Sequence, residues 1–173
     1  ATETLAAFAN SVGLIATEEL TTALPDIAGQ KGRLAMPVRG QLLRIKDEAD
    51  AAGVVRPGIV LATRPRALVT APTAATIRYR GPLLDYGQVL ILEPQQDTLF
   101  VLAGLAQVYG KIGQVVPAGS PLGLMGGQTS QIDAILSQSR DGAGIDRTET
   151  LYIEVRQGNV PVDPLDWFTS QKD

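Results

Sequence analysis

Near the C-terminus the chain reads Thr148-Glu149-Thr150-Leu151-Tyr152-Ile153-Glu154-Val155-Arg156. Leu151, Ile153 and Val155 alternate with polar or aromatic residues, and this period of two is typical of a strand with one buried face. The opposite face carries an aromatic ring, Tyr152, and a cation, Arg156, in place of only small solvated groups. This strand predicts a β fold, and its second face is the first candidate for a binding surface.

Short apolar segments punctuated by Gly and Pro occur on the N-terminal side of this strand. They are residues 41–45, 58–62, 67–72, 75–80, 88–93 and 98–102. Two further short strands, flanked by glycine turns, are expected within 104–126. Segments of this length and spacing predict a mainly β protein, an antiparallel sandwich or half-barrel.

Two stretches have helical spacing instead. Residues 2–24 carry Leu5, Phe8, Val12 and Ile15 at three- and four-residue intervals, and Pro25 ends the pattern. This helix either packs on its own domain, or belongs to a longer coiled coil, or forms an arm that covers a binding surface. A short inserted helix is expected within 127–147. We therefore divide the chain into a helical segment with its linker, residues 1–30, and a β domain, residues 31–173.

Composition excludes several functional classes. The chain contains no Cys and no His, so it has neither a thiol nucleophile nor the usual zinc ligands. Its net charge is −3, which gives no basic field for nucleic acid. No apolar run is long enough to span a bilayer. We expect no metal and no cofactor. The chain starts at Ala1 without a signal peptide, as a mature form or a trimmed piece would.

Residues 31–169 resemble the LytM, or lysostaphin-type, zinc metallopeptidase domain, and within that family they are most similar to the EnvC-type murein hydrolase activators. Residues 31–40 match the family's W-P-V-x-G, and residues 108–126 match its glycine-rich V-x-x-G-x-x-V pattern. The other landmarks are Ala71 and residues 86–91, 98–100, 151–156 and 162–167. The resemblance implies the LytM fold.

The chain departs from the family at its metal site. The family's H-x-x-x-D falls on Arg56 to Val60, its H-x-H pair falls on Thr150 and Tyr152, and its upstream assisting His falls on Leu102. None of these side chains rebuilds a tetrahedral zinc site, and without metal there is no activated water. The sequence therefore predicts a catalytically inactive homologue.

The resemblance also implies a partner-binding cleft. We expect the vestigial cleft to be lined by Tyr152, Arg156, Val60, Leu102, Tyr86 and Val89. In EnvC-type activators the corresponding cleft docks a periplasmic N-acetylmuramyl-L-alanine amidase. The implied function is activation of such an amidase in the periplasm during cell division and daughter-cell separation. An upstream coiled coil would link the domain to an inner-membrane division complex, and residues 1–25 would mask the cleft until release.

Other interpretations remain open from the residues alone. The domain could be a peptidoglycan-binding module without an amidase partner. A lipoyl-type carrier is suggested only by the glycines of 113–123, and Lys111 precedes that pattern instead of lying at a hairpin tip. Tyr152 and Arg156 could be ordinary exposed strand residues, with Arg156 paired to Glu154 or Asp163.

Overall fold

The computed structural model describes residue 5 and residues 28–95, 97–127 and 148–169. Among these residues the strands of the larger sheet are β1 (Gln41–Arg44), β2 (Ile59–Thr63), β4 (Ala75–Leu83), β5 (Gly87–Gln95), β6 (Thr98–Leu105), β8 (Val115–Val116), β10 (Glu149–Gln157) and β11 (Val160–Val162). A smaller sheet contains β3 (Leu68–Thr70), β7 (Gln107–Val108) and β9 (Pro121–Leu124). Two 3-10 turns, η1 (Ala28–Gln30) and η2 (Pro164–Asp166), complete the described elements.

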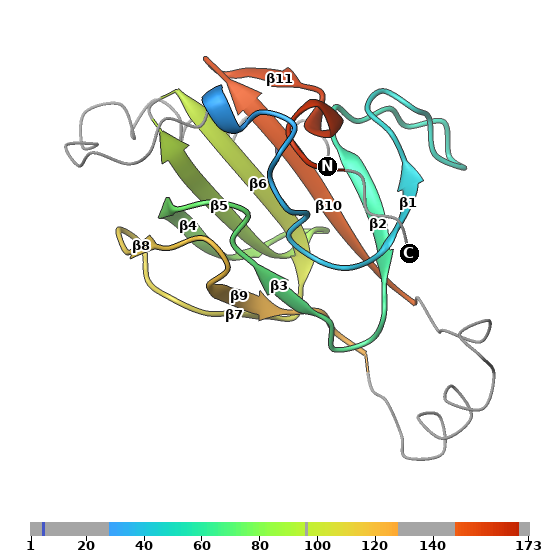
Figure 1. The fold of residues 1–173 in the computed structure, drawn as a ribbon. Coiled ribbons are helices and arrows are strands. Elements are labelled where there is room, and N and C mark those ends of the chain that lie inside the picture. The colour runs from blue at the N-terminus through green and yellow to red at the C-terminus, as the bar shows by residue number, and fades with distance from the viewer. Residues whose placement is uncertain (1–4, 6–27, 96, 128–147, 170–173) are drawn as a thin grey trace.

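The larger sheet is antiparallel and has the order β1-β2-β10-β6-β5-β4-β8, with β11 paired to β10. The smaller sheet, of order β3-β9-β7, packs against one of its faces (Figure 1). Strand β10, the stretch with the clearest alternation, lies in the middle, between β2 and β6. The prediction of a mainly β, antiparallel LytM-like fold is confirmed.

The main hydrophobic core lies between the two sheets. Leu151, Ile153 and Val155 of β10 are fully buried in this core, as their alternation predicts. Phe100 of β6 contacts the Trp167 ring edge-on at 6.4 Å between centroids, and Phe168 pairs with Leu34 in a parallel bridge. The aromatic contact attaches the C-terminal end of the domain to β6, and the bridge attaches it to the start of the domain.

The other face of the larger sheet carries a second, smaller cluster, which we call the outer cluster. Its buried members are Leu5, Val89, Ile91, Leu99, Val101 and Ala103. Tyr79, Leu83, Tyr86 and Tyr152 are half-buried and pack against it. The outer cluster therefore extends over β5 and β6 to the aromatic residue of β10.

The predicted strands all appear at their expected places, and β4, β5 and β6 run several residues beyond the predicted ends. Of the predicted helix over 2–24 only Leu5 is described; it is helical and 3% exposed. The rest of that helix and the inserted helix within 127–147 lie outside the described residues. No helix among the described residues is long and apolar enough to cross a membrane.

Candidate functional site: a pocket at the vestigial metal position

A pocket of about 430 Å³ opens where β2, β10 and β6 meet the turn between β4 and β5. Its lining consists of Arg56, Val60, Asp85, Tyr86, Gly87, Ala103, Gly104, Thr148, Glu149, Thr150 and Tyr152. The register of the sheet explains this convergence, because Tyr152 is paired with Val60 on one side and with Ala103 on the other. Residues that are nearly one hundred positions apart in the chain thus share one cavity.

One wall carries Arg56, the last residue of a loop, segment 45–56, in the connection between β1 and β2. Asp50 organises it, since its Oδ1 accepts hydrogen bonds of 2.9 Å from the amides of Ala52 and Val54. Its Oδ2 accepts a bond of 3.0 Å from Arg56 Nη1. The Val54 amide first, and then the Arg56 guanidinium, hold the pKa of Asp50 below its usual value. Arg56 is thereby held at the rim with its side chain 31% exposed.

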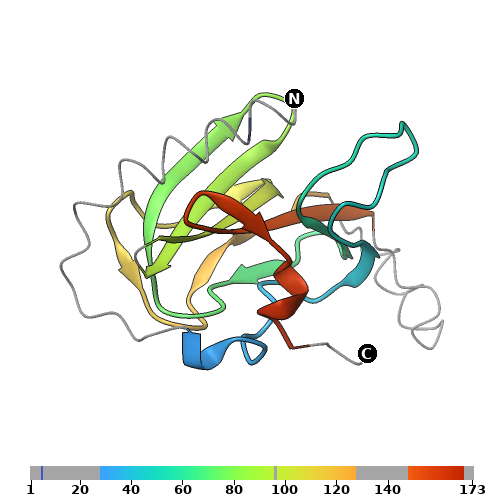
Figure 2. The same cartoon turned by 90° about the horizontal axis from the view of Figure 1, so that it is seen from above.

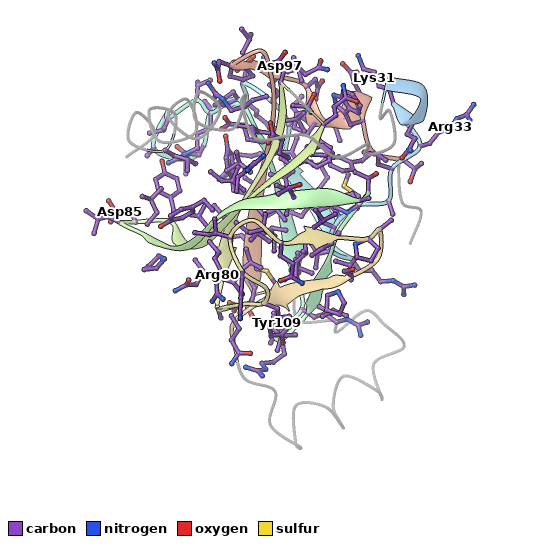
Figure 3. All side chains as sticks on the ribbon, turned by 90° about the vertical axis from the view of Figure 1, so that its left-hand side faces the viewer. Lys31, Arg33, Arg80, Asp85, Asp97 and Tyr109 are labelled. Carbon is purple, nitrogen blue, oxygen red and sulfur yellow. The ribbon has the colours of Figure 1, made fainter. Side chains whose placement is uncertain are left out.

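The opposite wall is the β4–β5 turn. The Tyr86 amide donates to Leu83 O at 2.9 Å, and Asp85 takes a left-handed conformation with φ of 69°. Asp residues tolerate that conformation better than most side chains do. The turn directs the Tyr86 ring onto the outer cluster, and its hydroxyl is buried without a hydrogen-bond partner among the described groups. Asp85 itself projects outward from the molecule (Figure 3).

The face of β10 that carries Tyr152 holds a row of three polar side chains. The Tyr152 hydroxyl donates to Glu154 Oε1 at 2.7 Å, and Arg156 Nη1 donates to Glu154 Oε2, also at 2.7 Å. Arg156 Nη2 donates to Asn159 O at 3.0 Å. Both members of the ion pair are almost fully buried, with side-chain exposures of 3% and 2%.

Tyr152 is fixed from two sides. Burial raises the pKa of its phenol well above the usual value, and the charge of Glu154 raises it further. The phenol is therefore neutral at physiological pH. Gly58 provides the space for the ring, because a Cβ at residue 58 would lie 2.5 Å from Tyr152 Cζ. The ring is held against β2 by this close approach.

The side chains at the family's ligand positions do not fit a zinc ion. Arg56 is a cation that is paired with Asp50, Val60 has no donor atom, and Tyr152 keeps its phenolic proton and donates a hydrogen bond to Glu154. Zinc sites use thiolate, imidazole or carboxylate ligands. The described residues contain no group of three His, Cys, Asp or Glu side chains that could hold a metal ion. The predicted ligand positions thus lie together in this pocket, but their side chains are not zinc ligands.

The structure brings five of the predicted site residues into one pocket: Arg56, Val60, Tyr86, Thr150 and Tyr152. The prediction that Leu102 lines the cleft is wrong, because Leu102 is paired with Ile153 and points into the main core. Val89 is also fully buried, beneath the cleft in the outer cluster. Arg156 is a buried partner of Glu154 and not an exposed anchor.

Sequence reasoning missed the β6 residues that do line the pocket, Ala103 and Gly104. The alternation of Leu99, Val101 and Ala103 places residue 103, and not 102, on the face that carries Tyr152. The sequence gives no signal for these positions, because residues 99–103 are apolar on both faces of the strand. Asp85 and Glu149 were missed because turn residues and strand ends have no such periodic signal.

Known proteins share this fold. The chain is 20% identical to a peptidase M23 from Pseudomonas aeruginosa, with a TM-score of 0.62 over 94% of this chain and 60% of that one. Helicobacter pylori Csd3 matches with 19% identity and a TM-score of 0.59 over 81% of this chain and 36% of Csd3. A chain of the SpoIIQ–SpoIIIAH pore-forming complex matches with 19% identity and a TM-score of 0.60, covering 81% of this chain and 92% of that chain.

A sequence relative is the uncharacterized protein NMB1333 of Neisseria meningitidis serogroup B, 26% identical over 138 residues. The match covers 80% of this chain but only 20% of the relative, so the chain spans about one fifth of the relative's length. The family model of peptidase family M23 matches residues 54–164, more than half of the chain. This segment contains the pocket and every position that we predicted to be equivalent to a metal ligand. The chain therefore belongs to peptidase family M23.

Proposed function

We propose that this domain is a non-catalytic M23 homologue that binds and activates a periplasmic N-acetylmuramyl-L-alanine amidase, in cell division and daughter-cell separation. The observation that carries the proposal is the convergence of Arg56, Val60 and Tyr152, three positions predicted to be equivalent to metal ligands, on one pocket. A cleft that no longer holds a catalytic metal is free to serve recognition alone.

The composition of the pocket supports protein recognition. Two tyrosine rings and an arginine border it, and these residue types are enriched where binding energy concentrates in protein interfaces. Arg56 and Tyr86 are partly exposed and come from two different turns, so a partner that enters the pocket would contact both. The similar fold in the SpoIIQ–SpoIIIAH complex is consistent with partner binding by domains of this kind.

Activation would follow from a shift between two states of the amidase. A regulatory segment of the amidase that blocks its own active site would bind the pocket more tightly than it binds the amidase. The ratio of the two affinities sets how far the amidase moves toward its open state. In this mechanism the M23 domain supplies binding free energy and no chemistry.

Leu5 supports the expectation that the N-terminal segment regulates access. It is 3% exposed and packs in the outer cluster with Ala103, whose neighbours Tyr86 and Tyr152 line the pocket. A residue from the start of the chain thus belongs to the cluster against which the Tyr86 and Tyr152 rings pack. We propose that residues 1–25 limit access to the pocket until another component withdraws them.

A matched pair of substitutions tests the amidase proposal. Thr150→Trp fills the pocket from an exposed position, and Val160→Trp adds the same ring on β11, which pairs with the far end of β10. Release of dye from labelled peptidoglycan by a purified amidase is measured with each variant. We expect Val160→Trp to stimulate like the unmodified chain and Thr150→Trp to lose about tenfold or more. Equal stimulation by both variants would contradict the proposal.

The same proteins distinguish the peptidoglycan-binding alternative from amidase activation. The unmodified chain is incubated with purified peptidoglycan without amidase and sedimented. Under the amidase proposal the chain stays in the supernatant, and co-sedimentation that Thr150→Trp abolishes would instead assign the pocket to a cell-wall peptide.

A further inference from the structure

Strand β1 forms a free edge of the larger sheet (Figure 1). It pairs with β2 alone, and in the described part of the chain no other backbone hydrogen bond reaches Gln41–Arg44. Segment 45–56 continues past the end of β1 and projects from the molecule (Figure 2). The outward N–H and C=O groups of β1 are therefore available to another strand.

The other sheet edges among the described residues are shorter or blocked. Strands β7 and β8 have two residues each, and β11 has three and contains Pro161, which has no N–H to donate. Strand β3 has three residues, and its Thr70 amide already donates to Pro37 O at 2.7 Å. With four residues, β1 is the longest of these edges. A strand added at β1 would therefore gain the most backbone hydrogen bonds.

The side chains of β1 are largely exposed. Leu42 is 40% exposed and Leu43 is 46% exposed, and Ile45, which follows the strand, is 49% exposed. Leu43 is the extra residue of a β-bulge, because its two neighbours pair with adjacent residues of β2. Its backbone is thus left unpaired in the ladder with β2. Three apolar side chains that face water along one edge indicate a contact surface.

Two arginines accompany these apolar side chains. Arg39 is exposed and Arg44 is half-buried, and neither guanidinium has an ion-pair or hydrogen-bond partner among the described residues. The carboxylates that follow in the sequence are already engaged. Asp47 is in an ion pair of 2.6 Å, and Glu48 Oε1 accepts from the Ile45 amide at 3.0 Å. The edge thus carries two uncompensated positive charges, which complement acidic side chains.

The same arginines oppose pairing of β1 with a second copy of the chain. If two β1 strands paired across a twofold axis, the arginines of both copies would lie along one seam. Like charges on neighbouring strands destabilise the pair, whereas opposite charges stabilise it. The charge of this edge therefore disfavours a second copy and favours an acidic strand.

We propose that β1 binds an extended, acidic segment of a partner protein by strand addition. The segment pairs with the backbone of β1, its carboxylates meet the two arginines, and its apolar residues contact Leu42, Leu43 and Ile45. We call these five side chains, together with the β1 backbone, the edge surface. None of the five lines the pocket, so this inference goes beyond the proposed function and does not depend on it. Backbone hydrogen bonds provide the affinity, and the side chains specify the partner.

Three short synthetic peptides test the inference. One alternates valine with glutamate, the second alternates valine with lysine, and the third is the glutamate peptide methylated at every backbone amide. Each is titrated into the full ¹⁵N-labelled chain. We expect the glutamate peptide to shift the amides of Gln41–Arg44 and to slow their hydrogen exchange.

We expect the lysine peptide to bind at least about tenfold more weakly, and the methylated peptide, which has no N–H to donate, not to bind. Equal binding of the lysine peptide would overturn the inference, because charge would then not select the segment. Equal binding of the methylated peptide would also overturn it, because no strand would then be added. Absence of shifts with all three peptides would have the same consequence.

Two cations at opposite edges of the larger sheet provide a matched control. Arg44 lies on β1, and Lys111 is exposed in the loop that leads to β8. We expect Arg44→Gln to weaken binding of the glutamate peptide by about threefold to tenfold, and Lys111→Gln to leave it unchanged. Arg39→Gln, at an exposed position before the strand, should weaken binding without altering thermal unfolding. Equal losses with Arg44→Gln and Lys111→Gln would mean that only net charge is sensed, and would overturn the site.

The pocket variant separates this inference from the proposed function. Thr150→Trp should leave binding of the glutamate peptide unchanged, because β2 lies between residue 150 and β1. Loss of binding in that variant would place the peptide in the pocket and overturn the inference. If the peptide binds at β1 but no amidase is stimulated, the amidase proposal fails and the edge surface stands. Concentration-dependent dimerisation that Leu43→Asp abolishes would assign the edge to a second copy of the chain, against the inference.

Discussion

The Tyr152 hydroxyl donates a hydrogen bond of 2.7 Å to Glu154 Oε1, two residues further along the same face of β10. Through this bond the aromatic wall of the pocket is coupled to a buried ion pair, because the other carboxylate oxygen accepts from Arg156. The face that the sequence marked as unusual is therefore a fixed internal network at one end and a pocket wall at the other.

The network makes Arg156 a structural residue. We expect Arg156→Met to lower the free energy of unfolding by about 3–5 kcal/mol, because Glu154 is then left as a buried charge without its partner. The double variant Glu154→Gln with Arg156→Met should recover a large part of that loss, since the neutral amide still accepts from Tyr152. Urea unfolding measures all three proteins. A double variant less stable than Arg156→Met would contradict this assignment.

The Gly58 backbone is expected to fix the position of Tyr152. In Gly58→Ala the new methyl group would lie 2.4 Å from Ile153 O and 2.5 Å from Tyr152 Cζ, so β2 and the ring must separate. We expect a loss of about 1–3 kcal/mol or more in urea unfolding. The control is Gly29→Ala, where no atom lies within 4 Å of the added carbon and where stability should change little. Equal stabilities would mean that Tyr152 is not held by this contact.

The two-residue alternation along the strands predicted which side chains of β10 are buried. The alternation of β10 placed Leu151, Ile153 and Val155 in the core and Tyr152 opposite them, because side chains on a strand alternate whatever the rest of the chain does. Leu102 was misplaced because its neighbours in sequence are apolar on both faces of β6, so hydrophobicity alone does not distinguish the main core from the outer cluster. The burial of Arg156 depends on contacts from other elements, which no local pattern encodes.

The Asp50 carboxylate should make the stability of segment 45–56 depend on pH in the acidic range. Its pKa is lowered in the folded chain by the Val54 amide and Arg56, from an unfolded value of 3.8. A lowered pKa contributes stability that is present above the unfolded value and is lost as the pH falls through the folded value. We expect Asp50→Asn to destabilise the chain at pH 7 and to have a smaller effect near pH 2. Carboxyl NMR titration and urea unfolding at both pH values measure this, with Asp97→Asn as the control. A pH-independent difference would exclude the linkage.

The positions predicted to be equivalent to metal ligands can be tested by introducing the family's ligand residues there. The triple variant Arg56→His, Val60→Asp and Tyr152→His returns the family's ligand types to three positions that line one pocket. We expect it to bind Co²⁺ with the visible absorption of a tetrahedral site, whereas the double variant that keeps Val60 should bind at least about tenfold more weakly. The unmodified chain is the blank. Identical cobalt spectra for the triple variant and the blank would show that the three positions do not form a ligand set.

Leu5 provides the sharpest test of control by the N-terminal segment. A buried leucine stabilises its contact by about 1.5–3 kcal/mol, and Leu5→Asp would replace that gain with the cost of a charge inside the outer cluster. If the contact limits access to the pocket, Leu5→Asp in the full chain should raise amidase stimulation severalfold while thermal unfolding still shows a folded domain. Deleting residues 1–25 should raise it to a similar extent, since both changes remove the same contact. Leu5→Ala should give an intermediate gain, because it removes contact area without adding charge. A fall in thermal stability with unchanged stimulation in all three proteins would mean that Leu5 only completes the packing of the outer face and does not control the pocket.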